Sequence, residues 1–265
     1  MCNRTVTTNC KPQEQRMIIG KYNINYVKVG SGPHHVLCIP GSLGSWEDFG
    51  YQIDEFNKEK FTLVILDPPG FGKSRPPERE YTLDHQDIDA TVAHALMMNL
   101  KIPRYSLLGW SGGVVPCMYI AATHPDVAQK LVVWGAQTYV LPSEVKYYQF
   151  FKDITQWSEA MRRQKIEMYG EETLLKLWSD WVDTLTTFSR IRNGDICTKV
   201  LPKIACPTFA LWGEKDPLVA REHIYYLQKH IKNCEIYLYP KGSHNIHMRY
   251  HTDFNTRVQE FLLSN

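Results

Sequence analysis

A serine at position 111 lies between two glycines, Gly109 and Gly113, and is followed directly by a third, Gly112. This spacing fits the pattern G-x-S-x-G, in which a serine sits on a sharp turn from a strand to a helix, with small neighbours beneath it. Such a turn would hold the hydroxyl out toward a substrate. It would also place it at a helix N-terminus, where free N–H groups stabilise an oxyanion. Glycine-rich turns with a serine also occur by chance in loops, so the pattern alone leaves both interpretations open.

A serine hydroxyl is a weak nucleophile at neutral pH, so it needs an imidazole to take its proton and a carboxylate to orient that imidazole. Two later positions in the chain supply these groups. Asp216 follows a predicted strand that ends at Trp212, and His244 follows one that ends at Tyr239. Three chemically matched residues, each at the end of a predicted strand and in the order nucleophile, acid, histidine, predict a catalytic triad.

A second acid lies in the loop of Asp216. Glu214 is two positions closer to the predicted strand. We favour Asp216 as the acid, because it lies directly at the turn from the strand end into the following helix.

Other histidines are candidates for different chemistry. His244 and His247 form an H-x-x-H pair, which is one half of many metal sites. Without a third ligand at the usual spacing, we expect no metal and a surface position for His247. His223 and His230 lie on the helix predicted after Asp216, and we expect both to be exposed.

Alternating strands and helices would bring these residues together. Predicted strands occupy residues 17–19, 24–29, 35–39, 61–66, 105–108, 130–134, 208–212 and 235–239. Predicted helices occupy residues 46–57, 84–99, 114–123, 218–231 and 252–263. Near-continuous apolar strands that alternate with helices indicate an α/β fold, with a mostly parallel eight-stranded sheet and helices on both faces.

The alternation stops between residues 141 and 200. This stretch is rich in helix formers and in large aromatic residues, among them Tyr147, Phe150, Trp157, Tyr169, Trp178, Trp181 and Phe188. Aromatics at helical spacing are often ordinary core packing. Because an insertion at the carboxyl edge of the sheet would lie where ligands bind in open α/β folds, we interpret it as a helical cap. The predicted division is a core of residues 1–140 and 201–265 and a cap of residues 141–200.

Composition excludes several classes of protein. The 265 residues include 30 basic and 28 acidic side chains, a net charge of +2, which gives no reason to expect nucleic acid or an anionic membrane as partner. Seven cysteines without a C-x-x-C pair argue against a disulfide framework or a zinc site and favour a reducing compartment. No apolar run approaches the roughly 18 residues of a membrane helix.

Two local patterns carry less weight. Gly72-Lys73-Ser74 suggests a phosphate-binding loop, but the first glycine of that motif would fall at Asp67, so the nucleotide hypothesis fails. The first 13 residues contain Arg4 and Lys11 and no acid, a faint similarity to an organellar presequence. We expect an intracellular protein, with the choice between cytoplasm and mitochondrion left open.

The chain resembles the α/β-hydrolase superfamily and, more narrowly, the biphenyl hydrolase-like group that includes valacyclovir hydrolase. The residues that carry the resemblance are 40–45, 74–77, 107–111, 134–136, 213–219 and 244–245. The resemblance implies that Ser111, Asp216 and His244 form the triad and that the backbone N–H groups of Leu43 and Gly112 form the oxyanion hole. It also implies hydrolysis of α-amino acid esters with no cofactor.

One residue departs from this resemblance. In valacyclovir hydrolase the residue after the nucleophile is an aspartate that pairs with the substrate ammonium, and here it is Gly112. An ammonium in a dry pocket without a carboxylate partner would carry a desolvation cost of several kcal/mol. Carboxylates of the predicted cap could supply the missing charge: Asp153, Asp180 or Asp183. Trp110 and Gly112, which flank the nucleophile, are expected to contact substrate.

We therefore expect a monomeric serine hydrolase that cleaves small carboxylic esters through an acyl-enzyme intermediate, with α-amino acid esters as candidate substrates. Two alternatives stay open: hydrolysis of a C–C bond in a ring-fission diketone, and a noncatalytic scaffold on the same fold.

Overall fold

The computed structural model describes residues 11–264, and every structural statement below concerns this part of the chain. Arg4 and two of the seven cysteines, Cys2 and Cys10, lie outside the described residues. The five described cysteines are free, and four of them are buried. No described helix combines the length and the apolar character that crossing a membrane requires.

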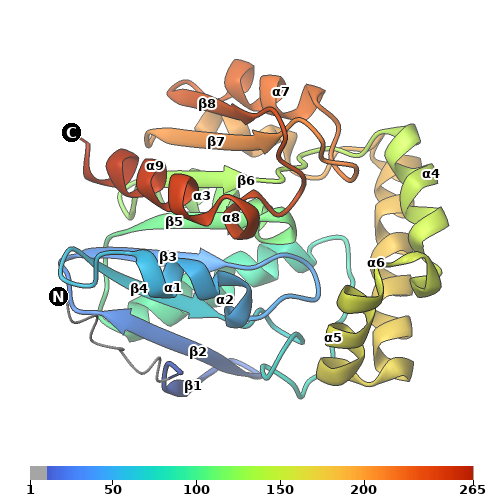
Figure 1. Ribbon diagram of the computed structural model, residues 1–265, viewed down its shortest axis with the longest axis horizontal. Helices are drawn as coiled ribbons and strands as arrows, with labels where there is room; N and C mark the ends of the chain where they lie inside the picture. The colour runs from blue at the N-terminus through green and yellow to red at the C-terminus, as the bar shows by residue number, and fades with distance from the viewer. Residues whose placement is uncertain (1–10, 265) are drawn as a thin grey trace, which may run out of the picture.

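One eight-stranded sheet forms the centre of the molecule, in the order β1-β2-β4-β3-β5-β6-β7-β8 (Figure 1). The hairpin of β1 (Glu14–Ile19) and β2 (Tyr22–Gly30) is antiparallel, and β2 pairs antiparallel with β4 (Phe61–Leu66). All later pairings are parallel, through β3 (His34–Ile39), β5 (Tyr105–Trp110), β6 (Ala128–Trp134), β7 (Thr208–Gly213) and β8 (Cys234–Tyr239). The predicted fold class is confirmed.

Helices cover both faces of the sheet. Because successive strand side chains point to opposite faces, Leu37 and Ile39 of β3 belong to one buried cluster and Val36 and Cys38 to the other. The first cluster includes residues of α2 (His85–Asn99), α3 (Val114–Thr123) and α7 (Glu222–His230). The second includes residues of α1 (Gly50–Glu55), α8 (Ile246–Arg249) and α9 (His251–Leu263). A strand whose two faces both pack against buried clusters must be largely apolar, as residues 36–39 of β3 are.

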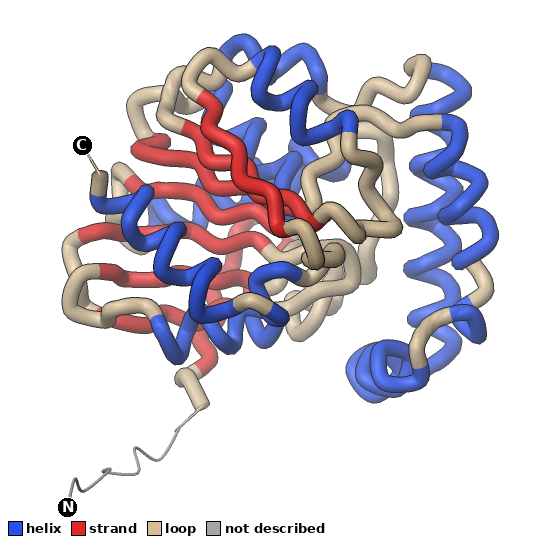
Figure 2. Tube along the Cα trace, turned by 45° about the horizontal axis from the view of Figure 1, so that its top comes forward, coloured by secondary structure: helices blue, strands red, loops and turns tan. Residues whose placement is uncertain are grey.

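Three helices between β6 and β7 stand apart from the sheet layers: α4 (Pro142–Phe151), α5 (Glu159–Tyr169) and α6 (Glu171–Ile191). Figure 1 places them together at the side toward which the arrows of the parallel strands point, and Figure 2 shows the same group of helices beside the end of the sheet. We call these three helices the cap. The division of the chain into separate core and cap units at residues 140 and 200 stays a prediction.

Two predicted helices differ in the structure. The helix predicted over residues 46–57 is a 3-10 turn, Trp46–Phe49, followed by the short α1. The helix predicted over residues 218–231 begins only at Glu222. It begins late because the N–H groups of Leu218 and Val219 donate to the side chain of Asp216 instead of forming a helical turn.

Candidate active site

Ser111 follows β5 directly and opens the turn into α3. Its φ is +51°, a left-handed conformation that non-glycine residues seldom adopt. The glycines on either side are required by close packing. A Cβ on Gly109 would lie 2.8 Å from the carbonyl oxygen of Gly113, and a Cβ on Gly113 would overlap the carbonyl of Ile39. The G-x-S-x-G spacing therefore corresponds to a tight turn that projects Ser111 from the end of the sheet.

His244 and Asp216 come together at the same end of the sheet. The imidazole Nδ1 lies 2.8 Å from Asp216 Oδ2, and the two side chains are only 9% and 1% exposed. Asp216 Oδ1 accepts hydrogen bonds from the N–H groups of Leu218 at 2.8 Å and Val219 at 3.2 Å. Both carboxylate oxygens are thus occupied, which fixes the orientation of the acid and of the imidazole.

The His244 imidazole is placed beside the serine turn through its neighbours. Trp110, which precedes Ser111, donates from Nε1 to the carbonyl of His244 at 3.3 Å. A Cβ on Gly135, at the end of β6, would lie 2.7 Å from the Cε1 atom of His244. Among the described residues Ser111 Oγ makes no hydrogen bond to the imidazole. Catalytic hydrogen bonds are often long or absent until substrate binds.

The loop after β3 packs against the serine turn. A Cβ on Gly41 would lie 3.1 Å from Ser111 Cβ, and a Cβ on Gly112 would lie 2.9 Å from the backbone nitrogen of Ser42. Leu43 has a φ of +59°. The predicted oxyanion-hole residues Leu43 and Gly112 therefore lie on two backbone segments in contact beside Ser111, which is the arrangement that two convergent N–H donors require.

A buried lysine of the cap reaches this loop. Lys165 of α5 is buried and donates from Nζ to the carbonyl of Leu43 at 2.8 Å. On the core side of the loop, Asp48 accepts from the N–H of Ser45 at 3.1 Å. Burial raises the pKa of Asp48, and the charge of Lys165 opposes this rise. Sequence reasoning missed Lys165, because nothing in the chain shows which face of a cap helix turns toward the core.

Asp67, just after β4, was considered above only as a mismatch to a phosphate-binding motif. Its carboxylate accepts from the N–H groups of Trp46 and Lys73, both at 2.8 Å, and from Asn25 Nδ2 at 3.0 Å. Burial raises its pKa against these hydrogen bonds. Asp67 therefore joins the loops after β3 and β4 and holds the segment that precedes α1.

Two expectations about histidines are wrong. His247 is fully buried, not on the surface, and its Nδ1 accepts from Trp134 Nε1 at 2.9 Å. Burial, together with the nearby His244, lowers its pKa to about 3. His223 is also fully buried, with its Nε2 3.0 Å from Glu144 Oε1. The described residues contain no group of three side chains able to hold a metal ion.

The three carboxylates that were candidates for the missing charge have other partners. Asp153 accepts from the N–H of Thr155, while Asp180 and Asp183 form ion pairs with Lys176 and Lys152 respectively. Asp153 and Asp183 are exposed, and Asp180 is partly exposed. Each carboxylate thus already has an ion-pair or hydrogen-bond partner.

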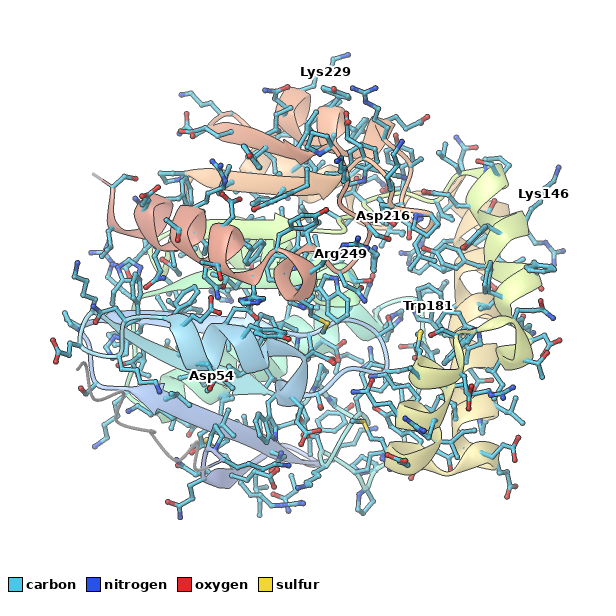
Figure 3. All side chains as sticks on the ribbon, viewed as in Figure 1. Asp54, Lys146, Trp181, Asp216, Lys229 and Arg249 are labelled. Atoms are coloured by element: carbon cyan, nitrogen blue, oxygen red, sulfur yellow. The ribbon has the colours of Figure 1, made fainter. Side chains whose placement is uncertain are left out.

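A small pocket lies beside Gly112. Its lining includes Ser42, Phe71, Arg79, Asp89, Gly112 and Trp181. Arg79 and Asp89 form a buried bidentate pair with N–O distances of 2.7 and 2.6 Å, so their charges cancel. Figure 3 labels Trp181 on the cap side and Asp216 on the core side of the boundary between cap and sheet.

Trp110, predicted to contact substrate, packs against His247 with ring centroids 4.5 Å apart and supports His244.

Comparison with known proteins gives a consistent result. A family model described as alpha/beta hydrolase fold matches residues 34–167. The serine hydrolase BPHL of Mus musculus is 41% identical over 93% of this chain and 85% of its own length. A 2-hydroxy-6-oxononadienedioate/2-hydroxy-6-oxononatrienedioate hydrolase of Pseudomonas sp is 24% identical over 92% of this chain and 93% of its own. The crystal structure of a serine hydrolase from Cycloclasticus zankles has a TM-score of 0.79 at 17% identity, covering 95% of this chain and 98% of that one.

Proposed function

Because this chain belongs to the alpha/beta hydrolase fold family, with serine hydrolases among its relatives, we propose that it hydrolyses small carboxylic esters through an acyl-enzyme intermediate. In this proposal Ser111 attacks the ester carbonyl and His244 accepts the proton from Ser111 Oγ. His244 then protonates the leaving alcohol. A water molecule activated by the same imidazole releases the acid.

The hydrogen bond between His244 Nδ1 and Asp216 Oδ2 is the observation that carries the proposal. In this hydrogen bond His244 carries its proton on Nδ1, facing the carboxylate. The other ring nitrogen, Nε2, is then left to act on Ser111. The two residues are separated by 28 positions and lie after different strands, so their contact is not a product of local sequence. The left-handed turn at Ser111 lies at the same edge of the sheet.

The proposal also concerns the charge of the substrate. Gly112 supplies no carboxylate, the Arg79–Asp89 pair in the adjacent pocket is neutral as a unit, and the cap acids are engaged elsewhere. A substrate ammonium would therefore be desolvated without an opposite charge. We propose that neutral esters are better substrates than α-amino acid esters.

Hydrolysis of a C–C bond is the second candidate function, and the dienedioate hydrolase relative supports it. Assays of neutral esters, α-amino acid esters and a dienedioate ring-fission product with one preparation separate the candidates. Turnover of the neutral esters alone supports the proposal. Preferred turnover of the dienedioate would overturn it.

The nucleophile is tested by Ser111→Ala. Removal of the attacking hydroxyl is expected to lower kcat by about 10³-fold or more while leaving the melting temperature within a few degrees. Ser31→Ala, which changes an exposed serine 80 positions before Ser111, is the matched control and should keep normal turnover. Near-normal kcat in Ser111→Ala would remove this residue from the mechanism.

A further inference from the structure

The loop that carries Asp216 is held from the cap side by α4. We call residues 214–221, between β7 and α7, the acid loop. Tyr148 of α4 is buried and donates from its hydroxyl to the carbonyl of Leu218 at 3.0 Å. Glu144, one turn earlier on the same helix, accepts from the N–H of Ala220 at 3.0 Å. Two side chains of one cap helix thus bind two peptide groups of one catalytic loop.

Glu144 is an unusual residue for this position. Its side chain is only 6% exposed, yet it is a carboxylate, and Lys146 two residues later extends from α4 into solvent (Figure 3). Buried carboxylates persist where donors fully satisfy them. Burial alone would raise the pKa of Glu144, but the hydrogen bond and charge of His223 and two backbone N–H groups hold that pKa below its ordinary value.

Four donors converge on this carboxylate, and they come from both parts of the molecule. Oε2 accepts from Gln137 Nε2 at 2.8 Å and from the N–H of Leu141 at 2.9 Å, both at the entry to the cap. Oε1 accepts from the N–H of Ala220 and from His223 Nε2, each at 3.0 Å, in the acid loop and α7. Glu144 is therefore the junction between the first cap helix and the segment that follows Asp216.

The contacts continue from Glu144 to the imidazole without a gap. Within residues 216–220, the N–H groups of Leu218 and Val219 hold Asp216 Oδ1, and Asp216 Oδ2 holds His244 Nδ1. A shift of this short segment would move the donors on Oδ1 and rotate the carboxylate away from His244. Errors of about 1 Å in a catalytic group can cost about 10²-fold in rate.

We propose that Glu144 is a positioning residue, which fixes the acid loop from the cap so that Asp216 orients His244, with Tyr148 as its second point of attachment. The proposal rests on the proposed function, since it assigns a purpose to the geometry of Asp216. Neither residue touches the reacting atoms. Their loss should therefore slow the chemical step while leaving substrate binding nearly unchanged.

The test measures kcat and KM separately for Glu144→Gln, Tyr148→Phe and the double variant on a neutral ester. Glu144→Gln keeps the shape but presents an amide NH₂ to donors, and Tyr148→Phe removes only one hydroxyl. We expect kcat to fall about tenfold in Glu144→Gln and severalfold in Tyr148→Phe, with KM within about twofold. Because both act on one loop, their effects should not multiply fully in the double variant.

Gln149→Ala is the matched control, because Gln149 lies on the same helix but donates to Thr186 of α6, an exposed contact within the cap. It should keep the kcat of the unchanged protein. The rate of Ser111 labelling by a fluorophosphonate gives a second readout, which should slow in step with kcat. Tyr148→Phe keeps the test decisive if Glu144→Gln fails to fold.

Unchanged kcat in a folded Glu144→Gln and in Tyr148→Phe would overturn the positioning role, as would a rise in KM with kcat preserved. Asp216→Asn, measured alongside, separates this failure from that of the proposed function. If Asp216→Asn is nearly inactive while the cap variants are normal, only the positioning role is wrong. If Asp216→Asn keeps normal turnover, the proposed triad is wrong, and the positioning role fails with it.

Discussion

Ser111 and Leu43, the proposed nucleophile and one proposed oxyanion donor, both have left-handed backbone conformations, with φ of +51° and +59°. Each such conformation in a non-glycine residue costs of the order of 1–3 kcal/mol, which the surrounding structure must offset. The offset is visible at both positions. The turn at Ser111 is packed between glycines that tolerate no Cβ, and the carbonyl of Leu43 is held by Lys165.

Single residues also show where sequence reasoning succeeds and where it does not. Ser111, Asp216 and His244 could be proposed from the sequence, because each has a type suited to the chemistry and lies at the end of an apolar run. His247 could not be placed correctly, because its environment is built from Trp110, Trp134 and Phe49, which are distant in the chain. Spacing alone gave no sign of that aromatic cage.

Gly112 tests how closely the loop after β3 packs against the turn at Ser111. A Cβ at this position would lie 2.5 Å from Ser42 Oγ and 2.9 Å from Ser42 N. The hydroxyl can rotate away but the backbone nitrogen cannot, so Gly112→Ala should displace residues 41–43. We expect kcat to fall about tenfold for neutral and amino acid esters alike.

The control for this change is Gly50→Ala, since a Cβ on Gly50 would meet nothing within 4 Å. Steady-state kinetics of both variants on the two classes of ester provide the measurement. A Gly112→Ala variant with full activity would show that the loop after β3 is not held tightly against Ser111.

Strands and helices could be predicted where the local pattern of apolar residues determines them. The parallel strands are largely apolar because their two faces contribute to two buried clusters, and the predicted ranges agree with the observed ones to within two residues. The start of α7 was misplaced by four residues because the Asp216 carboxylate captures N–H groups that a helix would have used. That competition depends on Asp216 being held by His244 and on the cap contact at Ala220, neither of which is visible in local sequence.

At this scale α5 has a function parallel to that of α4. Its Lys165 holds the carbonyl of Leu43, and Tyr169, one turn later, accepts from the N–H of Gly72 at 3.0 Å. Lys165→Met keeps most of the buried stem but leaves the Leu43 carbonyl without its donor. We expect kcat to fall about tenfold with little change in KM, because the loop after β3 loses one of its supports.

Lys176→Met provides the control, because Lys176 is an exposed cap lysine paired with Asp180. The same ester assay applies to both variants. Equal kcat in Lys165→Met and in the unchanged protein would show that the contact with Leu43 serves packing alone.

At the scale of the whole molecule, the sheet separates two buried clusters, and the cap lies over the edge where the parallel strands end (Figure 1). Loops after β3, β5, β7 and β8 meet at that edge. This explains why residues at positions 43, 111, 216 and 244 can form one site. The cap contributes polar contacts to these loops through side chains whose direction depends on the docking of α4 and α5, which no local pattern could reveal.

The stability of the whole molecule should depend on pH through its buried histidines. In the folded protein the pKa of His247 is lowered from 6.5 to about 3, so the unfolded chain binds more protons between these values. The free energy of unfolding should therefore fall as the pH is lowered through this window, by up to about 1.4 kcal/mol per pH unit for this group. Above pH 6.5 its contribution is complete.

His247→Asn isolates this effect, because the asparagine Oδ1 can still accept from Trp134 Nε1 but does not titrate. Urea unfolding between pH 6 and pH 4 should show a slope smaller by about 1 kcal/mol per pH unit. Part of the slope should remain, since burial and Arg79 lower the pKa of His85 to about 4. An identical pH dependence in the variant would mean that His247 is not buried in its neutral form.

The central claim is that Ser111 is a nucleophile activated by His244 and Asp216. The most direct measurement is the mass of the intact protein after reaction with a fluorophosphonate, followed by peptide mapping. We predict one adduct, on the peptide containing Ser111, formed at a rate that falls by orders of magnitude in His244→Ala. The absence of an adduct on Ser111 in a folded, unmodified protein, or labelling that is independent of His244, would contradict the claim and favour a noncatalytic protein on this fold.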